Sequence, residues 1–341
     1  SHRATLMVQR MAGQKGWTTC DKISLITRPT QTDFAPYLNP MITLLDGGLG
    51  QEIYKRSARP ATPLWSLSVM QDSPEIVRAV HRDFIQAGAK IITLNTYTAT
   101  PSRLRRDGDA TQLRALHALA LQVAQAARDE AGEEVQIAGC LPPLVGSYDA
   151  LLTPSYEDCL AEYQQLVEAQ AEGVDLFLIE TISTLREGLA AVEAARTSGK
   201  PILLSFTVSD DAPQVIRSGM SLIEVVGRLA DLPLSALLIN CATPEAVGYA
   251  LEIIKEGPFA FGGYANGFVS VEALKPGGTV EVLRAREDLS PEAYAQDAMT
   301  WVGKGASLVG GCCEVGPAHI AALRQQLEAA GYEVGGWRVP S

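Results

Sequence analysis

The chain has 341 residues, of which 47% are hydrophobic and 20% are charged, a composition typical of a folded globular protein and not of a disordered one. Its formal net charge of −11 argues against the basic face that nucleic-acid or anionic-membrane binding needs. No apolar run approaches the roughly 18 residues that span a bilayer, and the amino end lacks a secretory signal pattern. We therefore expect a cytoplasmic protein with no nucleic acid and no membrane as partner; whether it is a monomer or a homodimer stays open.

The first 40 residues do not fit the pattern of the rest of the chain. Ser1 and His2 are typical of a cloning remnant, so residues 1–40 are interpreted as an N-terminal extension that is partly tag-derived or irregular. Residues 41–341 are predicted to form a single domain. Six cysteines in a chain of this length do not indicate a disulfide scaffold, which favours a reducing compartment.

From residue 41 onward, short apolar runs alternate with longer amphipathic segments. Most runs are continuously apolar, as expected of strands buried on both faces of a parallel sheet. The eight predicted strands span residues 42–46, 90–95, 135–140, 175–180, 202–207, 236–241, 259–264 and 307–311. The eight predicted helices, several of which follow a Ser or open on Pro, span residues 74–87, 111–128, 156–172, 185–197, 221–230, 244–255, 291–303 and 317–330.

Eight such units of roughly 40 residues predict an α/β fold of the (β/α)8 TIM-barrel type. A doubly wound open sheet stays an alternative, because periodicity does not distinguish a closed sheet from an open one. Residues 271–289 form a long polar connection after the seventh predicted strand. Since barrel active sites form at the carboxyl ends of the strands, this connection either covers the site or is a solvated excursion.

Three cysteines follow the predicted carboxyl ends of two strands. Cys241 ends the sixth strand in LLINCATPE, and Cys312 and Cys313 end the eighth in SLVGGCCEVGP. In a closed barrel these ends face one mouth, so three sulfurs can converge on a thiophilic cation, usually Zn²⁺. Three protein ligands leave one coordination position open, which is typical of catalytic zinc. The alternatives are cysteines packed as small hydrophobes and a strained disulfide between the adjacent Cys312 and Cys313.

These motifs resemble the homocysteine S-methyltransferase family of zinc enzymes. The resemblance rests on LLDGGLGQEIYKR, INCATPE and GGCCEVGPAHI, with PLWS, NTYTAT and LFLIET in matching order. It implies a (β/α)8 barrel in which Cys241, Cys312 and Cys313 hold zinc. It also implies transfer of a methyl group from an onium donor, such as S-methylmethionine or betaine, to the thiol of homocysteine, giving methionine. No catalytic residue beyond the zinc site is implied.

The resemblance further assigns residues around the substrates. It places near homocysteine or its donor Asp46, the backbone of Gly47 and Gly48, Glu180, Asn95, Thr96 and, on the donor side, Trp65. Carboxylates at positions 46 and 180 suit the substrate ammonium group. The alternative for each carboxylate is to cap the helix that follows its strand.

Two loops depart from the family's pattern, namely AGCLPPLVGSY at residues 138–148 and Tyr264-Ala265-Asn266. Both lie toward the donor, so the identity of the donor stays open. Cys140, in the first loop, is expected to be a packed residue and not a ligand. Two other functions also stay open, a barrel with structural zinc acting in metal storage or protein interaction, and a methyltransferase for a different thiol. No cobalamin is expected, because the chain has no room for the extra domains of corrinoid-dependent relatives.

Overall fold

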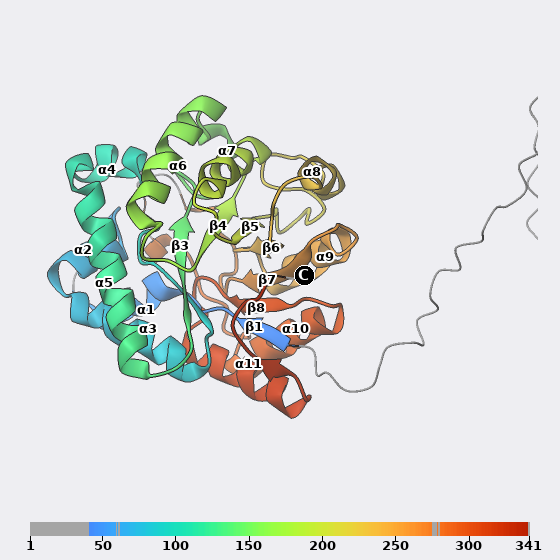
Figure 1. Ribbon diagram of the computed structural model, residues 1–341. Coiled ribbons are helices and arrows are strands. Elements are labelled where there is room, and N and C mark those ends of the chain that lie inside the picture. Colours follow the sequence, from blue (N-terminus) through green and yellow to red (C-terminus); the bar gives the residue numbers. More distant parts are fainter. Residues whose placement is uncertain (1–40, 59, 61, 275–277, 279, 340–341) are drawn as a thin grey trace, which may run out of the picture. The chain divides into compact units, whose positions relative to one another are not determined.

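The computed structural model describes residues 41–58, 60, 62–274, 278 and 280–339 (Figure 1). The predicted extension over residues 1–40 lies outside the described residues. The barrel strands are β1 (Met41–Leu44), β2 (Ile91–Thr93), β3 (Gln136–Leu141), β4 (Leu176–Ile182), β5 (Ile202–Phe206), β6 (Ala236–Asn240), β7 (Ala260–Ala265) and β8 (Leu308–Gly311). Each coincides with a predicted strand to within two residues at either end.

The sheet closes on itself. All strands are parallel and pair in chain order from β2 to β8, after which β8 pairs with β1. A parallel bridge between Leu45 and Ile91 joins the end of β1 to β2, and the Asp46 N–H donates to Ile91 O at 3.0 Å. Closure confirms the predicted (β/α)8 barrel and excludes the open doubly wound sheet.

Helices cover the outside of the barrel (Figure 1). The eight predicted helices are present as α3 (Pro74–Ala87), α5 (Leu113–Ala131), α6 (Tyr156–Gln170), α7 (Leu185–Arg196), α8 (Leu222–Leu229), α9 (Pro244–Ile254), α10 (Pro291–Gly303) and α11 (Pro317–Ala329). Five of them begin after a side chain that accepts a first-turn N–H: Ser155, Thr184, Ser221, Thr243 and Ser290. Within the described ranges, no helix is long and apolar enough to cross a membrane.

Several short elements were not predicted. They are the helices α1 (Leu49–Arg56), α2 (Ser66–Asp72) and α4 (Pro101–Asp107), and the 3-10 turns η1 (Ala110–Gln112), η2 (Ala150–Leu152) and η3 (Val280–Val282). Of the three helices, α1 and α2 lie between β1 and α3, and α4 follows β2. They extend the first two βα connections and so contribute to the carboxyl-end face of the barrel.

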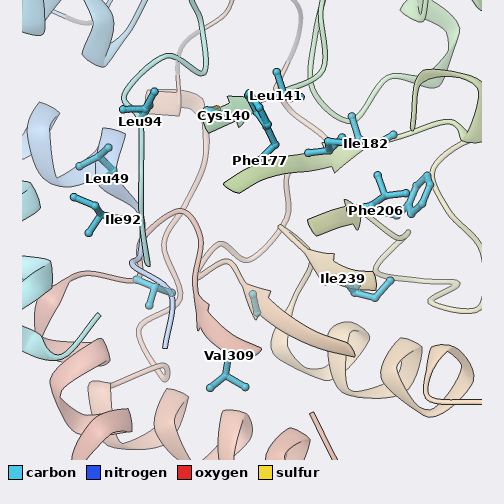
Figure 2. Close-up of a cluster of buried hydrophobic side chains, with 14 of the residues drawn as sticks. Leu49, Ile92, Leu94, Cys140, Leu141, Phe177, Ile182, Phe206, Ile239 and Val309 are labelled. Carbon is cyan, nitrogen blue, oxygen red and sulfur yellow. The ribbon is translucent and has the colours of Figure 1, made fainter. Parts of the chain in front are cut away.

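Buried apolar side chains form two groups on opposite faces of the strands. The larger group fills the space between strands and helices and includes Phe177, Phe206, Ile239 and Val309 (Figure 2). The smaller group alternates with it along the strands and fills the barrel interior with residues such as Leu176, Leu178, Leu203, Leu238 and Leu308.

The carboxyl-terminal segment packs on the amino end of the barrel. The short strand β9 (Glu333–Val334) pairs with β1 in the register Met41 with Glu333. The side chain of Trp337, which is 7% exposed, then joins the interior group. The backbone N–H of Trp337 donates to Gln136 Oε1 at 2.6 Å. This end of the barrel is therefore filled by side chains, and the opposite end is left for a site.

Candidate active site

A pocket lies at the carboxyl ends of the strands. Of the predicted site residues, its lining includes Asp46, Gly47, Gly48, Trp65, Asn95, Glu180, Cys241, Cys312 and Cys313. Leu274, Gly278 and Leu283 of the connection over residues 271–289 also line it. This connection therefore contributes to the wall of the pocket and is not only a surface excursion; residues 275–277 and 279 lie outside the described residues.

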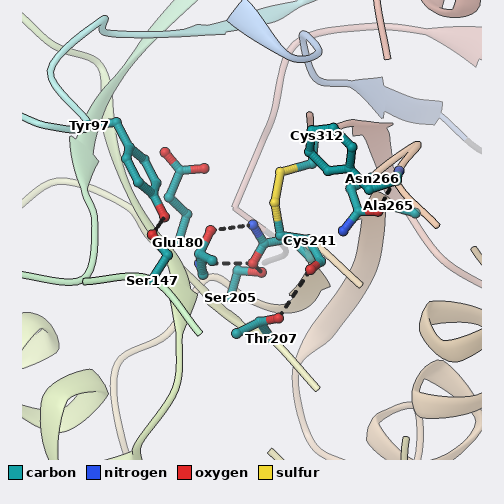
Figure 3. Close-up of a disulfide and its surroundings, with 12 residues drawn as sticks. Tyr97, Ser147, Glu180, Ser205, Thr207, Cys241, Ala265, Asn266 and Cys312 are labelled. Carbon is teal, nitrogen blue, oxygen red and sulfur yellow. Dashed lines mark hydrogen bonds between the residues drawn. A yellow bond between two sulfur atoms is a disulfide. The ribbon is translucent and has the colours of Figure 1, made fainter. Parts of the chain in front are cut away.

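The three predicted zinc ligands come together. The Sγ atoms of Cys241, Cys312 and Cys313 all lie within 4.8 Å of one another. Cys241 and Cys312 are joined as a disulfide with their Cα atoms 5.7 Å apart, and Cys313 is a free thiol (Figure 3). The alternative of a disulfide between the adjacent cysteines is therefore wrong, and of the three cysteines Cys313 alone carries a free thiol in this structure.

Reduction of this disulfide would leave three thiols around one point. Zinc–sulfur bonds of about 2.3 Å in a tetrahedral site place sulfur ligands about 3.8 Å apart. The separation of the three sulfurs, at most 4.8 Å, is compatible with that geometry after a small movement. The residues present thus fit a zinc ion with three thiolate ligands and one open position.

Glycines let the first strand end approach the cysteines. A Cβ at Gly47 would lie 2.1 Å from Val315 O, and a Cβ at Gly48 would lie 2.7 Å from Cys312 O. Only residues without a side chain allow this contact. The Gly48 N–H donates to Val315 O at 2.8 Å, so in this structure that donor is not free for a substrate carboxylate.

Helix α1 fixes the turn after Cys313. Glu314 has a φ of +63°, a left-handed conformation that is uncommon for a residue with a side chain. Its carboxylate accepts hydrogen bonds from Gln51 Nε2 and from Lys55 Nζ (3.0 Å). These contacts hold the turn in place and were not predicted from the sequence.

Asp46 and Glu180 bring two buried carboxyl groups to the pocket. Asp46 accepts from the Thr93 N–H at 2.8 Å, and burial raises the pKa of Asp46 to about 8, with a further rise from the Glu180 charge. Burial likewise raises the pKa of Glu180 to about 7, although a bond from Cys140 Sγ at 3.1 Å opposes the rise. Neither carboxylate caps a helix, and within the described structure neither forms an ion pair. A cationic ligand would therefore stabilise the charged form of both carboxyl groups and lower their pKa values.

Asn240 positions the end of β4. The register of β4 shifts between Ile179 and Ile182, and Thr181 has a φ of +60°. Asn240 Oδ1 accepts from the Thr181 N–H at 2.9 Å, and Asn240 Nδ2 donates to Thr181 Oγ1 at 2.8 Å. This fully buried pair fixes the residue next to Glu180. The signal in the sequence was a single amide at the end of the apolar strand ALLIN.

The remaining predicted residues differ in their surroundings. Asn95 accepts from Ser66 Oγ at 2.6 Å and donates to Ser66 O at 3.2 Å, so it holds the start of α2 beside Trp65. Trp65 has a φ of +53°, and its buried indole Nε1 has no hydrogen-bond partner among the described residues. Thr96 is buried but is not among the lining residues. Cys140 is packed, as expected, and its contact with Glu180 was not predicted.

Comparison with known proteins gives a consistent result. Residues 43–327 match the family described as homocysteine S-methyltransferase. The chain is 32% identical over 310 residues to the homocysteine S-methyltransferase of Escherichia coli, covering 83% of this chain and 94% of that protein. It is 27% identical to betaine–homocysteine S-methyltransferase 1 of Rattus norvegicus, covering 84% of this chain and 72% of that protein. The solved metallated form of the homocysteine methyltransferase MmuM from Escherichia coli is 29% identical and superposes with a TM-score of 0.70, covering 84% of this chain and 96% of that chain.

Proposed function

The chain belongs to the homocysteine S-methyltransferase family, and from this premise we propose that it transfers a methyl group from an onium donor to the thiol of homocysteine with the help of a bound zinc ion. The product is methionine. The observation that carries the proposal is the convergence of three cysteine sulfurs and two buried carboxyl groups on one pocket.

Cys241, Cys312 and Cys313 would hold the zinc once the disulfide is reduced. Sulfur-rich sites select thiophilic ions, and the similar Escherichia coli protein has been solved in a metallated form. When bound, zinc lowers the pKa of a coordinating thiol, so that the substrate sulfur is a thiolate at neutral pH. No further base is needed from the chain.

The chain's own side chains bind and orient the substrates. Asp46 and Glu180 would receive the ammonium group of homocysteine, and the positive charge would lower the pKa values that burial has raised. Trp65 and Tyr97 line the pocket with aromatic rings that suit a sulfonium or quaternary ammonium. Holding the donor methyl group in line with the acceptor sulfur lowers the activation free energy of the transfer by several kcal/mol.

A panel of donors tests the proposal. The reduced, zinc-loaded protein is incubated with homocysteine and, separately, S-methylmethionine, S-adenosylmethionine, betaine or dimethylsulfoniopropionate carrying deuterated methyl groups. We expect labelled methionine from at least one donor, detected by mass spectrometry. Cys159→Ala, a buried cysteine outside the pocket, is the matched control and should retain activity, whereas Cys313→Ser should lose it. Absence of labelled methionine with every donor would contradict the proposal.

A further inference from the structure

We propose that Cys140 is a positioning residue for homocysteine recognition: its thiol donates a hydrogen bond to Glu180 and holds that carboxylate toward the ammonium group of the substrate. This inference rests on the homocysteine binding proposed above and deepens it. It assigns a role to a buried cysteine that was expected only to pack.

The thiol of Cys140 lies behind the wall of the pocket and not in it. Cys140 is 1% exposed and is not among the residues that line the pocket, whereas Glu180 is one of them. The register of the barrel pairs Cys140 of β3 with Leu178 of β4, two residues before Glu180. The sulfur of Cys140 lies 3.1 Å from Glu180 Oε1. Cys140 therefore acts on a ligand in the pocket through Glu180 and not by direct contact.

A buried amide fixes the backbone of Cys140. Gln170, the last residue of α6, is fully buried. Its Oε1 accepts from the Cys140 N–H at 2.8 Å, and its Nε2 donates to Cys140 O at 3.1 Å. One side chain thus binds both polar backbone groups of Cys140. This arrangement holds the sulfur at a set distance from the carboxylate on β4.

The thiol is the hydrogen-bond donor that Glu180 has. Among the described residues, no other donor bonds to the Glu180 carboxylate, and no basic side chain forms an ion pair with it. Figure 3 shows Glu180 between Tyr97 and the disulfide, on the side where the substrate sulfur is expected. A single bond to Oε1 orients the carboxylate and leaves its second oxygen for a ligand.

A thiol suits this task because it is a weak and neutral donor. A basic side chain in the same place would neutralise the carboxylate and compete with the substrate ammonium. Burial, followed by the Glu180 charge, raises the pKa of Cys140 well above its usual range, so the sulfur keeps its proton. The bond from Cys140 also opposes the rise that burial causes in the pKa of Glu180. Cys140 thus orients Glu180 and favours its charged form without cancelling the charge.

Displacement calorimetry on the reduced, zinc-loaded protein tests the proposal with two ligands. Homocysteine is compared with 4-mercaptobutanoate, which has the same thiol and carboxylate but no amino group. We expect Cys140→Ala and Cys140→Val to weaken homocysteine binding about 5- to 30-fold and to leave 4-mercaptobutanoate within about twofold of wild type. Cys140→Ser retains a donor and should restore most of the homocysteine affinity. Cys159→Ala is the matched control, because Cys159 is also a buried free thiol but lies outside the pocket lining.

An infrared measurement on the ligand-free, zinc-loaded protein tests the hydrogen bond itself. The sulfur–hydrogen stretching band of Cys140 is the band that Cys140→Ser removes. A thiol bonded to a carboxylate should absorb at lower wavenumber than one bonded to a neutral amide, so Glu180→Gln should move this band to higher wavenumber.

Four results would overturn the proposal. They are full homocysteine affinity in both Cys140→Ala and Cys140→Val, an equal loss of affinity for both ligands, no recovery in Cys140→Ser, and an infrared band that Glu180→Gln leaves in place. An equal loss would indicate that the thiol only packs. The infrared shift without any binding of homocysteine to the wild type would instead contradict the proposed function and leave the hydrogen-bonded pair standing.

Discussion

The two ends of the barrel differ in what their residues do: one end is packed with side chains, and the other holds the pocket. At the amino end, the side chain of Trp337 fills the interior. Its backbone N–H donates to Gln136 Oε1 at 2.6 Å, and its backbone carbonyl accepts from Gln136 Nε2 at 3.2 Å. At the carboxyl end, the described chain has five residues other than glycine with positive φ: Trp65, Tyr148, Thr181, Cys241 and Glu314. Strained backbone is thus concentrated at the end of the barrel that holds the pocket, and the opposite end supplies packing.

This contrast separates the expected effects of substitution. Residues at the carboxyl end are held in unfavourable conformations and protonation states, so changing them should reduce activity without a matching loss of stability. The described residues at the amino end, such as Trp337, lie outside the pocket lining, so the reverse should hold.

The largest effect is expected from the cysteines. Cys241→Ser or Cys313→Ser removes one of three thiolate ligands, and loss of zinc activation should lower methionine formation about 1,000-fold or more. Elemental analysis of the reduced variants should find well below one zinc per chain. Urea unfolding of the metal-free proteins should change little. Full retention of zinc in every cysteine variant would contradict the assignment of the site.

Trp337→Ala should have the opposite effect, a loss of stability with little loss of activity. Removing this largely buried side chain leaves a cavity at the amino end and should lower the free energy of unfolding by about 3–5 kcal/mol. Since Trp337 is remote from the pocket lining, kcat/KM of the folded variant should stay within about twofold. Trp337→Phe is a milder control for cavity size. A large loss of kcat/KM in the folded Trp337→Ala protein would contradict the expectation that the amino end affects stability and not activity.

Glu180→Gln separates recognition of the amino acid from the metal. Losing the charged partner of the substrate ammonium should cost about 2–4 kcal/mol, which is about 30- to 1,000-fold in affinity for homocysteine. Zinc content should not change, because Glu180 is not among the clustered sulfur ligands. A thiol without an ammonium group should react equally slowly with wild type and variant. Zinc lost with homocysteine affinity retained would instead make Glu180 part of the metal site.

A pH dependence of stability is expected from Asp46. Its pKa is raised from 3.8 to about 8 by burial, so between these values the folded protein keeps a proton that the unfolded chain releases. This contribution to stability is fully present below pH 3.8 and is lost as the pH rises through about 8. In the ligand-free protein, unfolding free energy should therefore fall with rising pH, by at most about 1.4 kcal/mol per pH unit for this group. Asp46→Asn should flatten the slope measured by urea unfolding at pH 5 to 8, and identical slopes would contradict the assignment.

Periodicity predicted most of the fold. All eight barrel strands and their eight helices appear close to the predicted positions, because the strands are nearly continuously apolar and the helices carry an apolar face, five of them after a capping Ser or Thr. The short helices α1, α2 and α4 were missed because they lie inside connections with few periodic apolar positions. Strand β9 has two residues, too few for any pattern. Closure of the sheet also depends on the pairing of β1 with β2, which periodicity does not encode.

Most residues of the candidate site were predicted from the sequence, but the contacts between them were not. The cysteines, Asp46 and Glu180 stand at strand ends, where the barrel topology alone brings side chains together. The disulfide between Cys241 and Cys312 and the bond from Cys140 to Glu180 depend on which loops meet in space. Thr96 of NTYTAT is buried and is not among the lining residues, so its role near the substrates stays a prediction.

The most direct test of the central claim is zinc-edge X-ray absorption on the reduced, zinc-loaded protein with and without homocysteine. If Cys241, Cys312 and Cys313 hold zinc and the substrate thiol takes the open position, the spectrum should change from three sulfurs and one lighter ligand to four sulfurs at about 2.3 Å. The Cys159→Ala protein should behave in the same way. A spectrum that is unchanged under saturating homocysteine would contradict the account.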